Sequence, residues 1–156
     1  MDEYNLFKGF MNSSFMMYNA AFFGVHEAYF LVLKEEYRET AALDVMRRVM
    51  ELSLGKAYMS MGFTKGVPED FVRCVGERDK SVGLQIEFPV VSVNRIIYRF
   101  LTDPFPGLKG HVPPEKLDDT YMKFKVEFLL GKDWRYKTTK HMWKGGPFTE
   151  HVIERK

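Results

Sequence analysis

The apolar positions near the start of the chain recur at helical spacing. From Phe7 to Leu33 they are separated by three or four residues, at 7, 11, 15, 18, 22, 25, 29 and 33. This spacing predicts a helix from about Ser14 to Tyr37, with polar side chains at 12–14 able to cap its start. Because apolar residues also lie off the main stripe, we expect this helix to be buried nearly all round, as the central helix of the fold.

Two further helices are expected in the first half of the chain. One runs from about Thr40 to Met61 and ends at Gly62, a residue suited to stopping a helix. Its apolar residues share one face: Leu43, Met46, Val49, Met50, Leu54 and Tyr58. The other is short and begins at Pro68, followed by two acidic residues that favour a helix N-terminus, with Gly76 near its end.

In the second half of the chain the pattern changes to alternation. Residues 84–88 alternate between apolar and polar, and residues 91–100 are rich in β-branched and aromatic residues, so both are predicted strands. Residues 122–130 show the most regular alternation and are predicted to form a half-buried strand. Residues 134–143 and 148–154 are expected to form a closing hairpin, and connections this short require antiparallel neighbours.

These elements predict one α+β domain over residues 1–156. Residues 1–80 form the mainly helical half and residues 81–156 the mainly antiparallel sheet. We expect about three N-terminal helices packed on one face of a four- to five-stranded antiparallel sheet. The long helix 14–37 should lie across the apolar face of strand 122–130.

A long loop is expected between the strands, at residues 102–119. It holds four of the seven prolines of the chain. Loops of this length in compact domains often cover binding sites. The alternative is a stiff connection around the sheet edge with one helical turn starting at Pro114.

Composition narrows the classes of partner. Net charge is only +2, which argues against nucleic acid. The apolar stretch 15–33 contains Asn19, His26 and Glu27, and charged groups are costly in a bilayer, so no membrane span is predicted. Cys74 is the single cysteine, which leaves no intrachain disulfide and fits a cytoplasmic location.

Aromatic residues and methionine are abundant, with 14 Phe, 8 Tyr, 2 Trp and 10 Met. Such side chains can line a pocket for an apolar ligand, or simply fill the core of a small α+β domain. The chain lacks a P-loop, a GxGxxG fingerprint, an HExxH motif and a GxSxG elbow, so the sequence predicts no cofactor.

His26 shares one side of the first predicted helix with apolar residues. It is either a core histidine with a satisfied hydrogen bond or part of a pocket between helix and sheet. In the second case Glu27 or Tyr29 would line the pocket with it, and the low dielectric would tune the imidazole for proton transfer or ligand recognition.

A second group of candidate ligand contacts lies in the predicted sheet. Arg95 and Arg99 share one strand face, which is either a solvated surface or a clamp for a carboxylate. Tyr98 and Trp143 are candidate pocket walls.

The catalytic candidates are His26, Cys74 and His141. Cys74 has cationic neighbours, Arg73 and Arg78, that can lower a thiol pKa. The alternative is a buried, inert thiol.

Two registers of the closing hairpin are open. If Trp143 pairs with Phe148, His141 lies opposite Glu150. With one more residue in the Gly-Gly-Pro loop, His141 faces His151. Only the second register makes a two-histidine metal pair, and a third ligand is lacking, so no metal site is predicted.

The order of parts in residues 40–156 resembles the L-2-amino-thiazoline-4-carboxylic acid hydrolase-like proteins, and more distantly the vinyl-reductase-type small-molecule-binding domains. The resemblance lies in a helix-rich first half, the strand "NRIIYRFLTDPF", and the closing hairpin "WKGGPFTEHVIE". It implies a pocket domain, and a hydrolase acting on a C–N bond of a small cyclic carboxylic acid.

The chain departs from this pattern at its cysteines. Cysteines that recur in such proteins would fall near Thr102 or Asp103 and near Thr149, and none of these positions is cysteine here. The departure leaves thiol chemistry and a cysteine-borne metal unsupported.

The leading functional hypothesis is a small-molecule-binding domain. Its pocket would lie between the central helix and the sheet, under residues 102–119, and take a small apolar or carboxylate ligand. The predicted ligand contacts are His26, Tyr29, Arg95, Tyr98 and Trp143.

Two alternatives remain open. In the hydrolase implied by the resemblance, a histidine would act as the base and an arginine would hold the carboxylate. In an interaction module, an exposed aromatic patch would form a homodimer.

Overall fold

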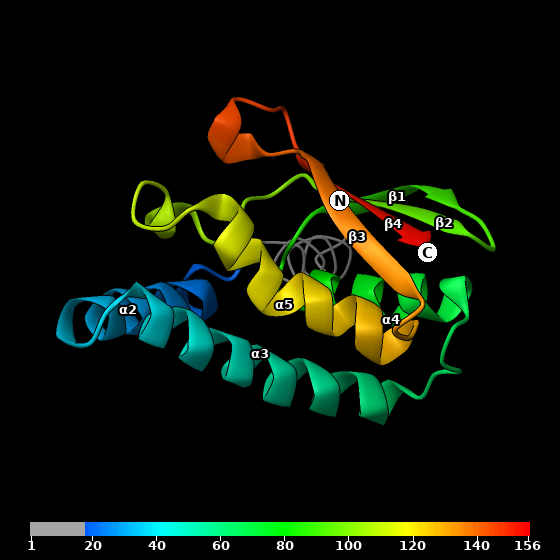
Figure 1. The fold of residues 1–156 in the computed structure, drawn as a ribbon, viewed down its shortest axis with the longest axis horizontal. Coiled ribbons are helices and arrows are strands. Elements are labelled where there is room, and N and C mark those ends of the chain that lie inside the picture. Colours follow the sequence, from blue (N-terminus) through cyan, green and yellow to red (C-terminus); the bar gives the residue numbers. More distant parts are fainter. Residues whose placement is uncertain (1–17) are drawn as a thin grey trace, which may run out of the picture.

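The computed structural model describes residues 18–156, and the first four residues of the predicted helix at 14–37, with all that precedes them, lie outside this range. It has a four-stranded antiparallel sheet on one side and layers of helices on the other (Figure 1). The predicted α+β class and antiparallel sheet are confirmed.

The strands are β1 (Ile86–Val91), β2 (Arg95–Phe100), β3 (Trp134–Lys140) and β4 (Thr149–Arg155). Their order in the sheet is β1-β2-β4-β3, and every neighbouring pair is antiparallel. β2 and β3 therefore run in the same direction on either side of β4. Such strands need a long crossover connection, which a hairpin turn cannot provide.

Helix α5 (Pro114–Leu129) makes this crossover. Residues 122–129 therefore belong to a helix, and the prediction of a strand at 122–130 is wrong. Pro114 occupies the first turn, where a missing N–H costs nothing. Met122, Val126 and Leu129 are buried on one face of α5, at the three- and four-residue spacing of a helix.

Apolar residues on a second face of α5 gave this segment the alternating sequence pattern of a strand. Phe124 and Phe128 stack on each other with ring centroids 4.8 Å apart, and Phe128 also packs near Tyr58 of the neighbouring helix. Gly55 makes room for Phe124. Apolar residues on two faces of one helix produced a spacing of two, and Lys125, which appeared to be on the polar side, is buried.

Helices α3 (Glu39–Met61) and α4 (Pro68–Ser81) confirm the second and third predicted helices. α3 ends at Gly62, whose φ of 71° suits glycine. α4 packs on β1 and α5 on β3, and α3 packs on α5 on the side away from the sheet (Figure 1).

Helix α2 (Ala20–Glu36) is peripheral, so the prediction of a central helix buried nearly all round is wrong. Its buried residues are Phe23 and Phe30, whereas Val25 is 54% and Tyr29 67% exposed. α2 lies beside α3 and contacts the short 3-10 turn η1 (Pro106–Leu108) (Figure 1). The helices that cover the sheet are α4 and α5.

The segment expected as a long loop is partly regular. It contains η1 and the first turn of α5, and it buries Phe105 and Leu108 in the core.

None of the helices within residues 18–156 combines the length and the apolar content that crossing a bilayer requires.

Candidate functional site

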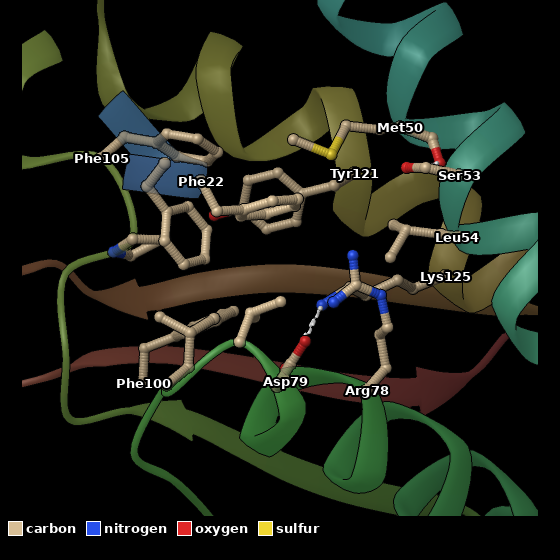
Figure 2. Close-up of a pocket in the computed structure, with 14 residues that line it drawn as sticks. Phe22, Met50, Ser53, Leu54, Arg78, Asp79, Phe100, Phe105, Tyr121 and Lys125 are labelled. Carbon is tan, nitrogen blue, oxygen red and sulfur yellow. Dashed lines mark hydrogen bonds and ion pairs between the residues drawn. The ribbon is translucent and has the colours of Figure 1, made fainter. Parts of the chain in front are cut away.

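The candidate site is a cavity of about 50 Å³ between helices α2, α3, α4 and α5, closed by the end of β2 and residues 104–105 (Figure 2). We call it the main cavity. Five aromatic rings form most of its wall: Phe22, Phe23, Phe100, Phe105 and Tyr121. Its polar lining is Ser53, Arg78, Asp79 and Lys125, and its other apolar lining is Met50, Leu54, Val82, Leu84 and Pro104.

The polar end of the main cavity is built on an ion pair between α4 and α5. Lys125 Nζ lies 3.3 Å from Asp79 Oδ1, and both residues are buried (Figure 2). Lys125 also donates a hydrogen bond of 3.1 Å to the Tyr98 hydroxyl, which in turn donates to Asp79. The three side chains form a closed network beneath the cavity.

Burial governs the protonation of this network. It lowers the pKa of Lys125, and the Asp79 carboxylate acts in the opposite direction. It also raises the pKa of Tyr98 well above its ordinary value, and the Asp79 charge adds to that increase. Tyr98 therefore stays protonated and donates, whereas an isolated buried lysine would be costly to charge. Asp79 is the partner that allows Lys125 to remain an ammonium.

Arg78 adds a second cation at this end. Its guanidinium lies over the Phe22 ring, 5.5 Å from the centroid, and the side chain is half-buried. Its one hydrogen bond with another side chain in residues 18–156 is a long contact of 3.4 Å to Ser81 Oγ. No carboxylate of this range forms an ion pair with it.

A second, smaller cavity of about 10 Å³ lies across the wall formed by Phe105 and Tyr121. This is room for about one water molecule. His141 Nε2 is 3.3 Å from Asp118 Oδ2, within ion-pair distance but without hydrogen-bond geometry. His141 Nδ1 accepts a hydrogen bond from the Trp143 N–H, so the proton of the neutral imidazole is on Nε2, toward Asp118.

Trp143 anchors the segment that closes the main cavity. Its indole N–H donates to Asp103 Oδ2 over 2.6 Å, and the other oxygen of Asp103 accepts the Phe105 N–H over 3.0 Å. Tyr18, two residues before α2, donates a hydrogen bond from its hydroxyl to the Pro104 carbonyl. Trp143 lines the small cavity and holds Phe105, a wall of the main cavity, in place.

The structure does not bring the predicted ligand contacts together. His26 and Tyr29 line a groove of about 300 Å³ between α2 and α3, away from the sheet. His26 Nδ1 is 2.8 Å from the Phe22 carbonyl. Arg95 lies on the outer surface of the sheet, 3.7 Å from Glu154. Tyr98 lies in the network beneath the main cavity.

The arginine clamp predicted in β2 is occupied by the protein itself. Arg99 Nε lies 2.6 Å from Glu150 Oε2, and its Nη1 lies 3.0 Å from Glu87 Oε1. These contacts fit the solvated sheet surface that the sequence favoured for Arg95 and Arg99, with the clamp as the alternative.

Cys74 has the environment of an inert thiol. It is fully buried in α4, and its Sγ is 3.8 Å from the Gly62 carbonyl. Burial raises the pKa of the Cys74 thiol more than the nearby Arg73 lowers it. A buried, protonated thiol is a poor nucleophile.

The closing hairpin adopts neither predicted register. Lys140 lies opposite Glu150 and Thr138 opposite His151, with an irregularity between them. His141 therefore does not face His151, which is fully buried with Nδ1 3.0 Å from the Thr138 hydroxyl. Within residues 18–156 no group of three or more His, Cys, Asp or Glu side chains is arranged to hold a metal ion.

Arg78, Asp79 and Lys125 did not emerge from the sequence as site residues. A helical signal was present for Lys125, because Pro114 and the acidic Glu115 are typical of a first helical turn. Extending that helix to 129 would have placed Lys125 on its buried face. The pairing with Asp79, 46 residues earlier, has no signal in the sequence.

The hydrolase alternative requires a histidine and an arginine that line the same cavity. Neither of the two cavities has both. Arg78 lines the main cavity without a histidine, and His141 lines the small cavity without an arginine.

No family model and no curated protein sequence matches this chain. A solved structure is similar: the crystal structure of the phenol-responsive sensory domain of the transcription activator PoxR with phenol. The TM-score is 0.58 at 12% sequence identity, over 90% of this chain and 75% of that chain. At this identity the likeness shows a shared fold.

Proposed function

We propose that this chain is a small-molecule-binding domain that takes a small aromatic molecule into the main cavity. The observation that carries the proposal is a cavity walled by five aromatic rings and closed at one end by the buried Lys125–Asp79 pair. Ligand sites typically combine a mostly apolar wall with a few fixed polar groups that orient the ligand. Aromatic rings pack against such walls in offset or edge-to-face arrangements.

The structural neighbour supports the same class of ligand. It is a phenol-responsive sensory domain, solved with phenol. A ring with one polar substituent has the same division into apolar body and polar end that the main cavity has.

The main cavity must widen to admit a ring. Its volume is about 50 Å³, whereas an engineered apolar cavity of ~150 Å³ holds benzene. The walls include Met50, which is flexible, and Arg78, whose long side chain can swing outward. Phe22 and Phe23 belong to α2, which packs on α3 and η1 at the edge of the molecule. These parts of the wall can move without disturbing the sheet.

A larger side chain that fills the main cavity tests the proposal. Val82→Phe places a ring in the main cavity, and Val25→Phe makes the same change on the exposed side of α2. Isothermal titration with phenol and benzoate should show saturable binding to the wild type and to Val25→Phe, and at least tenfold weaker binding to Val82→Phe. Absence of saturable binding, or equal binding by Val82→Phe, would contradict the proposal.

The homodimer stays a prediction. Exposed large apolar side chains on α2 and α3 are Val25, Tyr29, Val32, Val45, Val49, Leu52 and Met59. Gel filtration with light scattering measures the oligomeric state directly.

A further inference from the structure

The charged side chains that line the main cavity are two cations and one carboxylate. Arg78 and Lys125 carry the positive charges, and Asp79 carries the negative charge. Figure 2 shows the two cationic side chains approaching the Asp79 end of the cavity from α4 and α5. The Arg78 charge acts on Lys125 and lowers its pKa. The polar end therefore has a surplus of one positive charge.

Hydrogen-bond donors are also in surplus at this end. The Lys125 ammonium has three N–H donors, and its acceptors are Asp79 and the Tyr98 hydroxyl. The Arg78 guanidinium has five N–H donors, of which one makes the long contact to Ser81 Oγ. A ligand that enters here meets more donors than acceptors.

We infer that the ligand of the main cavity carries an anionic group, a carboxylate on an aromatic ring, held by Arg78 and Lys125. This inference rests on the proposed function and names its ligand class. A carboxylate supplies the missing negative charge and up to four acceptor sites, and the guanidinium fork matches its geometry. In a cavity with mostly apolar walls such a charge-assisted contact is stronger than in water.

Asp79 and Arg78 have different roles in this arrangement. Asp79 bonds to Lys125 and Tyr98 and keeps both in position beneath the cavity. Arg78 has no such partner within residues 18–156 and is half-buried, so it is the group that can follow a ligand inward. We therefore place Arg78 as the residue that selects for charge.

A matched set of probes tests the ligand class. Benzoate, benzamide and benzamidine share a ring and a planar head group of nearly equal size, with charges of −1, 0 and +1 at neutral pH. Isothermal titration with wild-type protein should give at least tenfold tighter binding of benzoate than of benzamide, and the weakest binding for benzamidine. Raising the salt concentration should weaken benzoate binding and leave benzamide unchanged.

Arg78→Gln tests the residue. It should weaken benzoate binding about tenfold and leave benzamide within twofold of wild type. Lys80→Gln removes the same charge from an exposed position of the same helix, outside the cavity, and should leave both affinities unchanged. Arg78 makes no ion pair within residues 18–156, so its replacement should leave folding intact, which circular dichroism verifies.

The outcomes separate this inference from the proposed function. If the three probes bind with equal affinity, or if Arg78→Gln reduces benzamide and benzoate binding equally, the anionic ligand class is overturned and the aromatic cavity stands. If neither phenol nor any of the three probes binds saturably, the proposed function is overturned, and the ligand class with it.

Discussion

At the residue scale, the Lys125–Asp79 pair is coupled to the stability of the fold. Lys125 is 3% and Asp79 4% exposed, so removing either partner leaves the other charge buried without compensation. Lys125→Met or Asp79→Leu alone should each lower the free energy of unfolding by about 3–5 kcal/mol. The double variant should cost much less than the sum of the two, because it removes both charges together.

Urea denaturation of the two single variants and the double variant at pH 7 gives this coupling energy. If the loss of unfolding free energy in the double variant equals the sum of the losses in the two single variants, the two residues are not coupled. Tyr98 loses its acceptor when Asp79 is replaced, so a residual cost of about 1 kcal/mol is expected in the double variant.

The buried His151 should make the folded state less stable as the pH falls. Burial lowers the pKa of His151 from 6.5 to about 4, so the unfolded chain takes up a proton in a range where the folded chain does not. The free energy of unfolding should therefore drop by about 2 kcal/mol between pH 7.5 and 5 from this residue. The charged groups acting on it are Asp118, Lys125, His141 and Glu150.

His151→Gln is the variant that tests this effect. Its free energy of unfolding, measured by urea denaturation at both pH values, should lack that 2 kcal/mol of the decrease. An unchanged decrease would assign the pH dependence to other groups. Glu27 cannot account for such a decrease, because burial raises its pKa and the folded state therefore favours its proton.

At the element scale, α2 approaches one glycine of η1 through the Glu27 side chain. The Glu27 carboxylate lies against Gly107, and a Cβ at Gly107 would overlap with it. The carboxylate is the far end of a flexible side chain, so Gly107→Ala should turn it away from Gly107 and lower the free energy of unfolding by about 0.5–1.5 kcal/mol. Gly24→Ala, in the interior of the same helix with no atom within 4 Å of its Cβ, should raise it by about 0.5–1 kcal/mol.

Thermal unfolding of the two alanine variants compares the sites directly. Adding Glu27→Ala to Gly107→Ala removes the overlapping carboxylate and should restore most of the loss. If Gly107→Ala is as stable as wild type, the Glu27 carboxylate is not held against Gly107.

Most elements could be predicted from local patterns, and the exceptions have identifiable causes. Helices α3 and α4 have one apolar face each and clear end signals, and β2 and β4 are rich in β-branched and aromatic residues. α5 was missed because Phe124 and Phe128 face α3 while Met122 and Val126 face the sheet, and the two sets together imitate alternation. α2 was predicted as a helix with the wrong burial, since its apolar residues are partly left exposed.

The candidate site could not be predicted because it depends on how α4 and α5 pack. A half-polar segment of α4 and an alternating segment of α5 each give ordinary local patterns. Only their packing joins Asp79 to Lys125 and places Arg78 beside them. Aromatic richness was the one compositional signal for the pocket, and a plain core of a small α+β domain accounts for it as well.

At the scale of the whole molecule, ligand binding should tie the peripheral helix to the layer that covers the sheet. α2 packs on α3 and η1, whereas the main cavity is walled by α2 on one side and α5 on the other. Benzoate at about 100 times its dissociation constant should stabilise the folded state by about 2.7 kcal/mol and raise Tm by about 5–10 °C.

Hydrogen–deuterium exchange shows which parts of the chain the bound ligand stabilises. Because an aromatic ligand would contact Phe22 and Phe105 from within the cavity, exchange should slow in α2 and in residues 103–108. Amides of the β3–β4 hairpin, whose strands do not line the main cavity, should exchange at unchanged rates while the protein stays folded. Uniform slowing across helices and sheet would show a ligand that acts on global stability alone, and slowing confined to the hairpin would place its site elsewhere.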